Sequence, residues 1–279
     1  QWRYEVSNHL FTFVAFWLVV SFSYAKQTAS EYPVKSDFTN SVKIEMKLLR
    51  SGSLTFGQGA DYKIPILKKE LIHSVSIGKP FWISKYEITQ EAYEKIVGTN
   101  PSRFKSPNKP VERVTWFEAR LFCMFLTSRE RRKGLIPSSM HYTLPSEAQW
   151  EYACRAGSKK ALYGEKLLKN DIAWSADNSQ SSMKVGLKAP NKWGLYDMLG
   201  NVQEWCLDVW YDNFIGAPHD ESARIHNPDN ENSWHLSAVV KGGAWDHRDI
   251  AIKCYYRAKK LKHIRDSRTG FRIVLCEIK

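Results

Sequence analysis

The chain has 279 residues, of which 43% are apolar, so it can fill a hydrophobic core and is excluded from the disordered classes. This length fits one large domain or two small ones. The net charge of +12 favours anionic partners such as nucleic acid, acidic glycans, anionic lipid or a bacterial envelope; the alternative is a solvated surface that is merely basic. No nucleic-acid motif accompanies the basic run at residues 257–265, so we expect no nucleic-acid partner.

The N-terminal part contains an apolar run, residues 10–25, that is short for a transmembrane helix. Ser23 and Ala25 place small residues where a signal peptidase cleaves, which predicts a signal peptide over residues 1–25. The alternative is an uncleaved N-terminal anchor. Cleavage would leave no transmembrane span and a secreted or periplasmic protein, in whose oxidising surroundings disulfides persist.

A polar stretch follows, residues 26–41, and predicts a linker before a folded domain over residues 42–279. Alternating apolar and polar residues between turn-forming residues predict short strands. These strands are expected at residues 44–48, 54–56, 81–88 and 269–275.

Three helices are expected from their capping residues. The first follows Thr89, and the second begins near Thr115 with apolar residues at helical spacing. The third begins at Ser146, which forms a capping box with Gln149, and it ends at Gly157. Short strands, capped helices and long aromatic-rich loops together indicate an α+β domain.

Seven short segments of the chain resemble motifs of one known family and occur in the same order as in that family. One such segment would be weak evidence of a relationship, whereas seven in order are strong evidence. They read WISKYEIT (82–89), NPSRF (100–104), PVERVTW (110–116), LPSEAQWEY (144–152), GLYDMLGNVQEW (194–205), KGGAW (241–245) and GFR (270–272). Together they resemble the formylglycine-generating enzyme family, also called sulfatase-modifying factor domains. The resemblance covers roughly residues 42–276 and implies a C-type-lectin-like α+β fold with little regular secondary structure.

The segment at residues 194–205 has oxygen donors spaced around tight glycines, which suits calcium. The resemblance implies that a structural calcium ion is held by the Asp197 and Glu204 carboxylates and by the backbone carbonyls of Gly200 and Val202. The alternative is that the two carboxylates only cap a turn or pair with a lysine.

The family's aerobic enzymes bind copper(I) with two cysteines in the loop after a Gly-Gly-Ser motif, because copper(I) requires soft thiolates. In this chain the motif reads Gly242-Gly243-Ala244, and both cysteines are absent, so we expect neither copper nor a catalytic residue. The side chains in the loop could hold a different metal or could simply line a polar, degenerate cleft. The candidate cleft residues are Trp245, Asp246, His247, Asp249 and Arg257.

The five cysteines leave at least one without an intramolecular partner. The resemblance implies a disulfide between Cys154 and Cys254. A bridge between Cys123 and Cys276 is left open, because Cys276 is displaced by three residues from the family position. Cys206 is expected to be a small buried residue.

Two classes of function remain. The first is a secreted sulfatase-modifying-factor domain that has lost or exchanged the oxidase chemistry of formylglycine generation and acts on an unknown protein or peptide. The second is a non-catalytic lectin-like module that binds an anionic glycan or an acidic protein through variable loops. Trp205, Trp210 and Trp245 could line a groove or pack in the core, and Arg272 is expected to order the terminal strand.

Overall fold

The computed structural model describes residues 36–56, 73–163, 169–225 and 236–278. The expected signal peptide lies outside the described residues, as does the expected linker up to residue 35. The first strand, β1 (Phe38–Thr39), pairs with β2 (Glu45–Leu49), so the sheet begins inside the segment expected to be linker.

The three expected helices are present. They are α1 (Gln90–Val97), α2 (Trp116–Arg132) and α3 (Glu147–Arg155), and a further short helix is α4 (Lys169–Ile172). Thr115 and Ser146 each form a capping box, which satisfies backbone N–H groups at the helix start. The third helix ends earlier than expected, because Ala156 already takes the left-handed conformation, with φ of 46°.

The strands form three sheets. The first has the order β1-β2-β5-β11-β6, the second β10-β7-β8-β9, and the third is the β3-β4 hairpin. All pairings are antiparallel except that of β10 with β7. The remaining bounds are β3 (Gly52–Phe56), β4 (His73–Ile77), β5 (Phe81–Ser84), β6 (Met140–Thr143), β7 (Gln203–Val209), β8 (Ser237–Lys241), β9 (Arg257–Leu261), β10 (Thr269–Gly270) and β11 (Val274–Glu277).

The expected terminal strand at residues 269–275 is two strands in two sheets. β10 pairs with β7, and β11 pairs with β5 and β6. Arg272 lies between the two strands, and its side chain is fully buried. The segment that contains it connects the four-stranded sheet to the five-stranded sheet.

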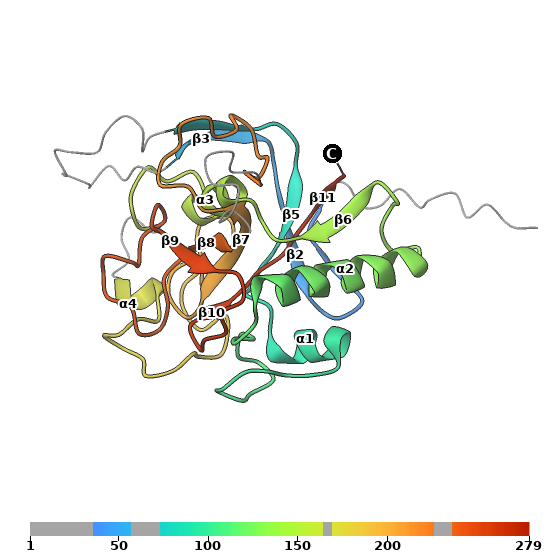
Figure 1. Ribbon diagram of the computed structural model, residues 1–279, viewed down its shortest axis with the longest axis horizontal. Coiled ribbons are helices and arrows are strands. Elements are labelled where there is room, and N and C mark those ends of the chain that lie inside the picture. The colour runs from blue at the N-terminus through green and yellow to red at the C-terminus, as the bar shows by residue number, and fades with distance from the viewer. Residues whose placement is uncertain (1–35, 57–72, 164–168, 226–235, 279) are drawn as a thin grey trace, which may run out of the picture. The chain divides into compact units, whose positions relative to one another are not determined.

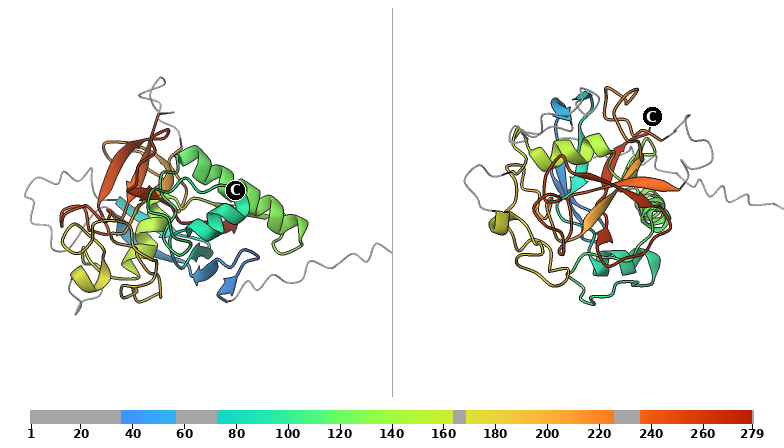
Figure 2. Two further views of the ribbon diagram at one scale, coloured as in Figure 1. Left: turned by 90° about the horizontal axis from the view of Figure 1, so that it is seen from below. Right: turned by 60° about the vertical axis from the view of Figure 1, so that its left-hand side comes forward.

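Two apolar clusters fill the domain. One joins α1 and α2 to the five-stranded sheet, where Phe122 and Leu126 of α2 are fully buried; Figure 1 shows the two helices beside this sheet. The other surrounds α3, which lies beside β7 and β8 (Figure 2). Trp150 and Cys154 of this helix are fully buried. Within the described ranges, no helix is both long and apolar enough to cross a membrane.

Candidate functional site

The expected calcium segment, residues 194–204, is a run of tight turns that leads into β7. Asp197 and Gly200 have φ of 52° and 78°, in the left-handed region. At Gly200 a Cβ would lie 2.0 Å from the carbonyl oxygen of Trp174, so only glycine allows this approach. The turn holds the expected backbone ligands, Gly200 and Val202, and buries the Asp197 side chain.

The Glu204 carboxylate is fully buried, and both of its oxygens have partners. Arg272 Nε donates to Oε2 at 2.7 Å, and Arg272 Nη2 donates to Oε1 at 2.8 Å. Trp150 Nε1 also donates to Oε2, at 2.6 Å. The same guanidinium donates to the carbonyl oxygens of Ser84 and Tyr196 at 3.1 and 3.0 Å. Glu204 is therefore the counterion that keeps this arginine buried where the two larger sheets meet.

Asp197 differs from Glu204, because one of its oxygens has no partner. Its Oδ2 accepts from the Gly186 N–H at 2.6 Å, whereas its buried Oδ1 has no hydrogen-bond partner among the described residues. Burial raises the pKa of Asp197 to about 6. A third carboxylate, Glu87, accepts from the Val202 N–H at 3.0 Å and from Asn201 Nδ2 at 2.6 Å. Sequence reasoning missed Glu87, which is 115 residues from Val202 and belongs to no ligand spacing.

Three carboxyl groups, those of Glu87, Asp197 and Glu204, lie near the single guanidinium of Arg272. Burial, and then the charges of Asp197 and Glu204, raise the pKa of Glu87 well above its usual value. The partnerless Oδ1 of Asp197 fits a cation ligand. Glu204 does not fit as a free ligand, because Arg272 and an indole occupy both oxygens. In the part of the chain that the structure describes, no three His, Cys, Asp or Glu side chains are placed to hold a metal ion.

The loop after Gly243 is anchored to the body of the domain. A Cβ on Gly243 would lie 2.7 Å from a backbone oxygen of the loop's far end, so the loop closes tightly on itself. The Trp245 N–H donates to the Asn201 carbonyl at 2.8 Å, and its Nε1 donates to the Ser267 carbonyl at 3.0 Å. Its ring meets Phe104 edge to face, with centroids 5.6 Å apart. This loop thus lies directly against the carboxylate-bearing turn.

Asp246 and His247 follow, half-buried and close together. His247 Nε2 lies 3.9 Å from Asp246 Oδ1, and Arg268 Nη1 lies 3.6 Å from Asp246 Oδ2. Burial lowers the pKa of His247, although the charge of Asp246 acts in the opposite direction. Asp246 Oδ1 and His247 Nδ1 are buried and have no hydrogen-bond partner among the described residues.

A neighbouring loop, residues 174–182, contributes further buried polar atoms without partners. The two loops are in contact, since the Ala176 N–H donates to the His247 carbonyl at 3.1 Å. Buried polar atoms are normally satisfied, so such a concentration indicates a place for water or a ligand. The atoms from this loop are Trp174 Nε1, Ser175 Oγ and Ser182 Oγ.

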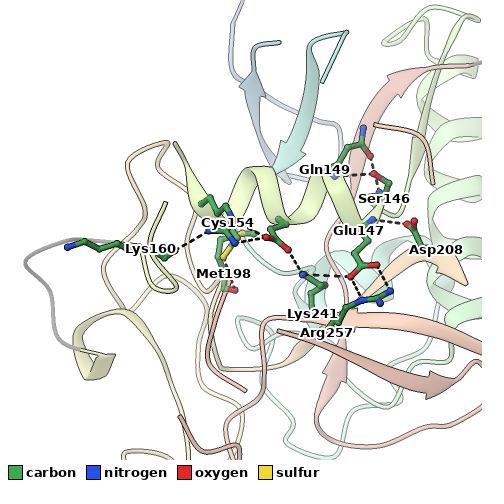
Figure 3. A network of polar contacts seen from close by, with 11 residues as sticks. Ser146, Glu147, Gln149, Cys154, Lys160, Met198, Asp208, Lys241 and Arg257 are labelled. Carbon is green, nitrogen blue, oxygen red and sulfur yellow. Dashed lines mark hydrogen bonds and ion pairs between the residues drawn. The ribbon is translucent and has the colours of Figure 1, made fainter. Parts of the chain in front are cut away.

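The other two expected cleft residues lie elsewhere. Asp249 is 72% exposed and pairs with Lys169 of α4. Arg257 of β9 forms a two-pronged ion pair with Glu147 of α3, at 2.7 and 2.9 Å (Figure 3). Both side chains therefore have ion-pair partners outside the loop after Gly243, and a cleft shared with Trp245 stays a prediction.

Arg257 instead belongs to a buried charge network around α3. Lys241 Nζ donates to Glu151 Oε2 at 2.8 Å and lies 3.9 Å from Glu147 Oε1. Asp208 accepts from the Glu147 N–H at 2.7 Å, at the start of the helix. Burial, and then the charge of Glu147, raises the pKa of Asp208 to about 7. The sequence analysis recognised Lys241 as part of the segment KGGAW. Nothing in the sequence indicated that its side chain pairs with Glu147 and Glu151.

The cysteines fall into two neighbouring pairs and a single residue. Cys154 and Cys254 are both fully buried, and each is recorded as a thiol. Burial and a hydrogen bond with Cys254 raise the pKa of Cys154, so the two sulfurs are side by side. Cys276 is close enough to affect the pKa of Cys123. Cys206 is buried in the cluster around α3, as expected.

Trp205, Trp210 and Trp245 were considered as residues that line a groove, and of these Trp245 lies in the loop after Gly243. Trp205 is fully buried and donates to the Val114 carbonyl at 3.0 Å. Trp210 stacks near Arg257, whose guanidinium carbon is 4.3 Å from the ring centroid. Only Trp245, of these three, lies beside the cluster of partnerless polar atoms.

The sequence of the chain is similar to two known proteins described here, and its fold is similar to one solved structure. The chain is 32% identical over 210 residues to the chaperone protein LppX of Paenibacillus barcinonensis, covering 59% of this chain and 69% of that protein. It is 27% identical over 222 residues to the formylglycine-generating enzyme of Mus musculus, covering 73% of this chain and 53% of the enzyme. The chain thus spans about half the length of that enzyme. The structure of Treponema denticola variable protein 1 matches with a TM-score of 0.71 and 26% identity, over 87% of this chain and 99% of that one.

These matches confirm the α+β fold of the C-type-lectin-like kind that the seven segments implied. A family model, the sulfatase-modifying factor enzyme 1-like domain, matches residues 33–276. The chain therefore belongs to the family of sulfatase-modifying factor enzyme 1-like domains.

Proposed function

We propose that this chain is a secreted or periplasmic sulfatase-modifying-factor domain that does not generate formylglycine. The observation that carries the proposal is the loop after Gly243, in which residues 244–252 contain no sulfur. Copper(I) requires soft thiolate ligands, whereas imidazole and carboxylate are harder ligands that prefer other metals. Trp245 also anchors this loop to Asn201 and Ser267, so a thiol from elsewhere would have to displace a packed side chain.

Cys254, the cysteine nearest to the loop in sequence, does not replace the missing pair. All five lie among the described residues, and Cys254, which is nearest to the loop in sequence, is fully buried beside Cys154. A nucleophilic or metal-binding cysteine needs its thiolate form and access to the substrate. Burial raises the pKa of Cys154 and so disfavours the thiolate.

The test supplies the purified protein with copper, oxygen and a sulfatase-type peptide containing cysteine. Mass spectrometry of the peptide should show no loss of sulfur, while an active formylglycine-generating enzyme converts the same peptide. Turnover that disappears in Cys254→Ser but survives in Cys154→Ser would overturn the proposal, because it would make Cys254 the catalytic thiol.

The second candidate is a lectin-like module that binds an anionic glycan or an acidic protein. It is supported by the partnerless polar atoms around Asp246 and His247, which offer donors and acceptors without an assigned role. Cations surround the same place: Arg268 lies beside Asp246, and Lys109 Nζ is 5.6 Å from the Phe104 ring centroid. The 32% identity to a protein named a chaperone is compatible with a role in binding.

Binding to a sulfated oligosaccharide and to an acidic peptide, each measured over a range of salt concentrations, tests this candidate. Arg268→Ala should weaken the binding of an anionic ligand and reduce its salt dependence. Lys95→Ala, which removes an exposed cation on α1, is the matched control and should change neither. If neither probe binds, or if both variants behave alike, the binding module is wrong.

We propose calcium as a structural cofactor of the same turn, with Asp197 as its anchor. The partnerless Asp197 Oδ1 and the three carboxyl groups gathered around one guanidinium support it. Backbone carbonyls of Gly200 and Val202 would complete the set. A bridge between Cys154 and Cys254, formed after export through cleavage at Ala25, belongs to the same proposal.

A further inference from the structure

A hollow that includes no residue of the loop after Gly243 is lined in part by β5, β6 and β11. These three strands are neighbours in the five-stranded sheet (Figure 1). The hollow has a volume of about 380 Å³, within the range of small-molecule sites. Its walls are formed by strands β5, β6, β7 and β11, the start of α3, one residue of α2 and the segment at residues 221–225. None of the candidate residues considered so far for metal or substrate contributes to it.

Three polar side chains of different chemistry meet in this hollow. Cys276 and His141 are direct partners in the antiparallel pairing of β11 with β6, so their side chains project from the same face of the sheet. Arg120 reaches the hollow from α2. Burial lowers the pKa of His141, and the positive charge of Arg120, which lines the same hollow, lowers it further.

The Arg120 guanidinium has no assigned counterion. None of the ion pairs or hydrogen bonds recorded among the described residues includes it, and its recorded contact is with the Trp116 ring, 5.4 Å from the centroid. The acidic residues in the same wall have other contacts: Glu277 pairs with Lys79 at 2.6 Å, and Glu221 accepts from a backbone N–H at 2.8 Å. A buried nitrogen of His141, Nδ1, has no hydrogen-bond partner among the described residues either.

The rest of the wall is largely apolar, and part of it is open to solvent. Phe81 is buried at the base, while Ile225 and Ile278 are 62% and 53% exposed at the rim. Exposed isoleucines beside a partly buried, unpaired cation leave two kinds of surface poorly satisfied at one place. A ligand that satisfies both has an apolar body and one negative charge.

We propose that this pocket binds a small amphipathic carboxylate, whose head group meets Arg120 and His141 and whose apolar part lies on Phe81, Ile225 and Ile278. The planar guanidinium offers a carboxylate two parallel hydrogen bonds, and the imidazole adds a third. Cys276 lies beside the head group, so its thiol reports on whether the pocket is filled.

The test uses the whole protein, reduced and folded, with octanoate as the probe. Iodoacetamide should alkylate Cys276 before the other four cysteines, which are buried, and peptide mass spectrometry follows each site. Octanoate should slow the alkylation of Cys276 in a saturable manner. Octylamine, which has the same chain and the opposite charge, should not.

Variants then place the effect at the head group. Arg120→Gln should raise the octanoate concentration needed for half-protection by roughly tenfold to hundredfold, because a hydrogen bond to a charged group is lost. Arg120→Lys keeps the positive charge but cannot form two parallel hydrogen bonds to a carboxylate. Its octanoate concentration for half-protection should lie between those of Arg120→Gln and the wild type. Arg132→Gln, at an exposed arginine of the same helix, is the control and should match the wild type.

Three results would each overturn the proposal. The first is an alkylation rate of Cys276 that octanoate leaves unchanged. The second is equal protection by octylamine, which would show apolar contact alone. The third is full protection in Arg120→Gln, which would place the carboxylate elsewhere. Thermal unfolding of each variant shows whether it is folded, and Arg120→Lys serves if Arg120→Gln is not.

Discussion

The buried pair of Glu204 and Arg272 allows the two roles expected for Glu204 to be separated. As the counterion of Arg272, Glu204 stabilises the folded chain whether or not calcium is present. Either Glu204→Ala or Arg272→Ala leaves a buried charge unpaired, which costs about 3–5 kcal/mol of unfolding free energy. In a domain of this size, each kcal/mol shifts the melting temperature by about 2–4 °C, so either variant should melt about 6–20 °C below the wild type.

The double variant provides the sharper result. With both partners removed, neither Glu204 nor Arg272 is left without the other, so the loss should be below the sum of the two single losses. Thermal unfolding followed by circular dichroism, in chelator and again in calcium, measures all four proteins. Additive losses would refute the assignment of Glu204 as the partner of Arg272.

The calcium proposal is tested in the same experiment. A ligand at 100 times its dissociation constant adds about 2.7 kcal/mol of stability, so wild-type protein should melt several degrees higher in calcium than in chelator. Asp197→Asn should abolish that difference, because it removes the charge of the carboxylate whose partnerless oxygen lies in this turn. Identical melting of the wild type in both buffers would show that calcium does not bind.

Three further predictions concern stability. A bridge between Cys154 and Cys254 closes a loop of about 100 residues and should add up to about 4.7 kcal/mol over the reduced protein; recovery of both as alkylated thiols from exported protein would refute it. Because burial raises the pKa of Asp208 from 3.8 to about 7, the folded state keeps this proton longer and loses stability as pH rises from 4 to 7. Asp208→Asn should flatten that slope in pH-dependent melting, and an unchanged slope would contradict the assignment. Gly200→Ala should cost more than about 3 kcal/mol in denaturant unfolding, since its Cβ meets a backbone oxygen, whereas Gly134→Ala, equally left-handed but in open space, should cost about 1–2 kcal/mol; equal losses would contradict the steric argument.

Local structure could be predicted well from the sequence where one or two neighbouring residues decide it. Thr115 with Glu118, and Ser146 with Gln149, form capping boxes within four residues of chain, so the helix starts follow from short-range hydrogen bonding. The end of α3 was less well predicted, because Ala156 takes a left-handed conformation that its residue type does not favour.

The candidate site was only partly predictable. The sequence identified the turn at Asp197, and the absence of thiols after Gly243, because both are properties of contiguous residues. It could not assign Glu87, which reaches the turn from the segment between β5 and α1. It also grouped Arg257 with Asp246, although the strand that carries Arg257 directs it to Glu147 on α3.

Family, fold class and helix starts were thus determined by the sequence itself, because they depend on ordered short motifs and local caps. The tertiary structure alone decided that Glu204 is committed to Arg272, 68 residues away, and that Arg120, His141 and Cys276 meet in one pocket. Such pairings depend on which strands become neighbours, and that choice is made by burial across the whole domain, which no local spacing records.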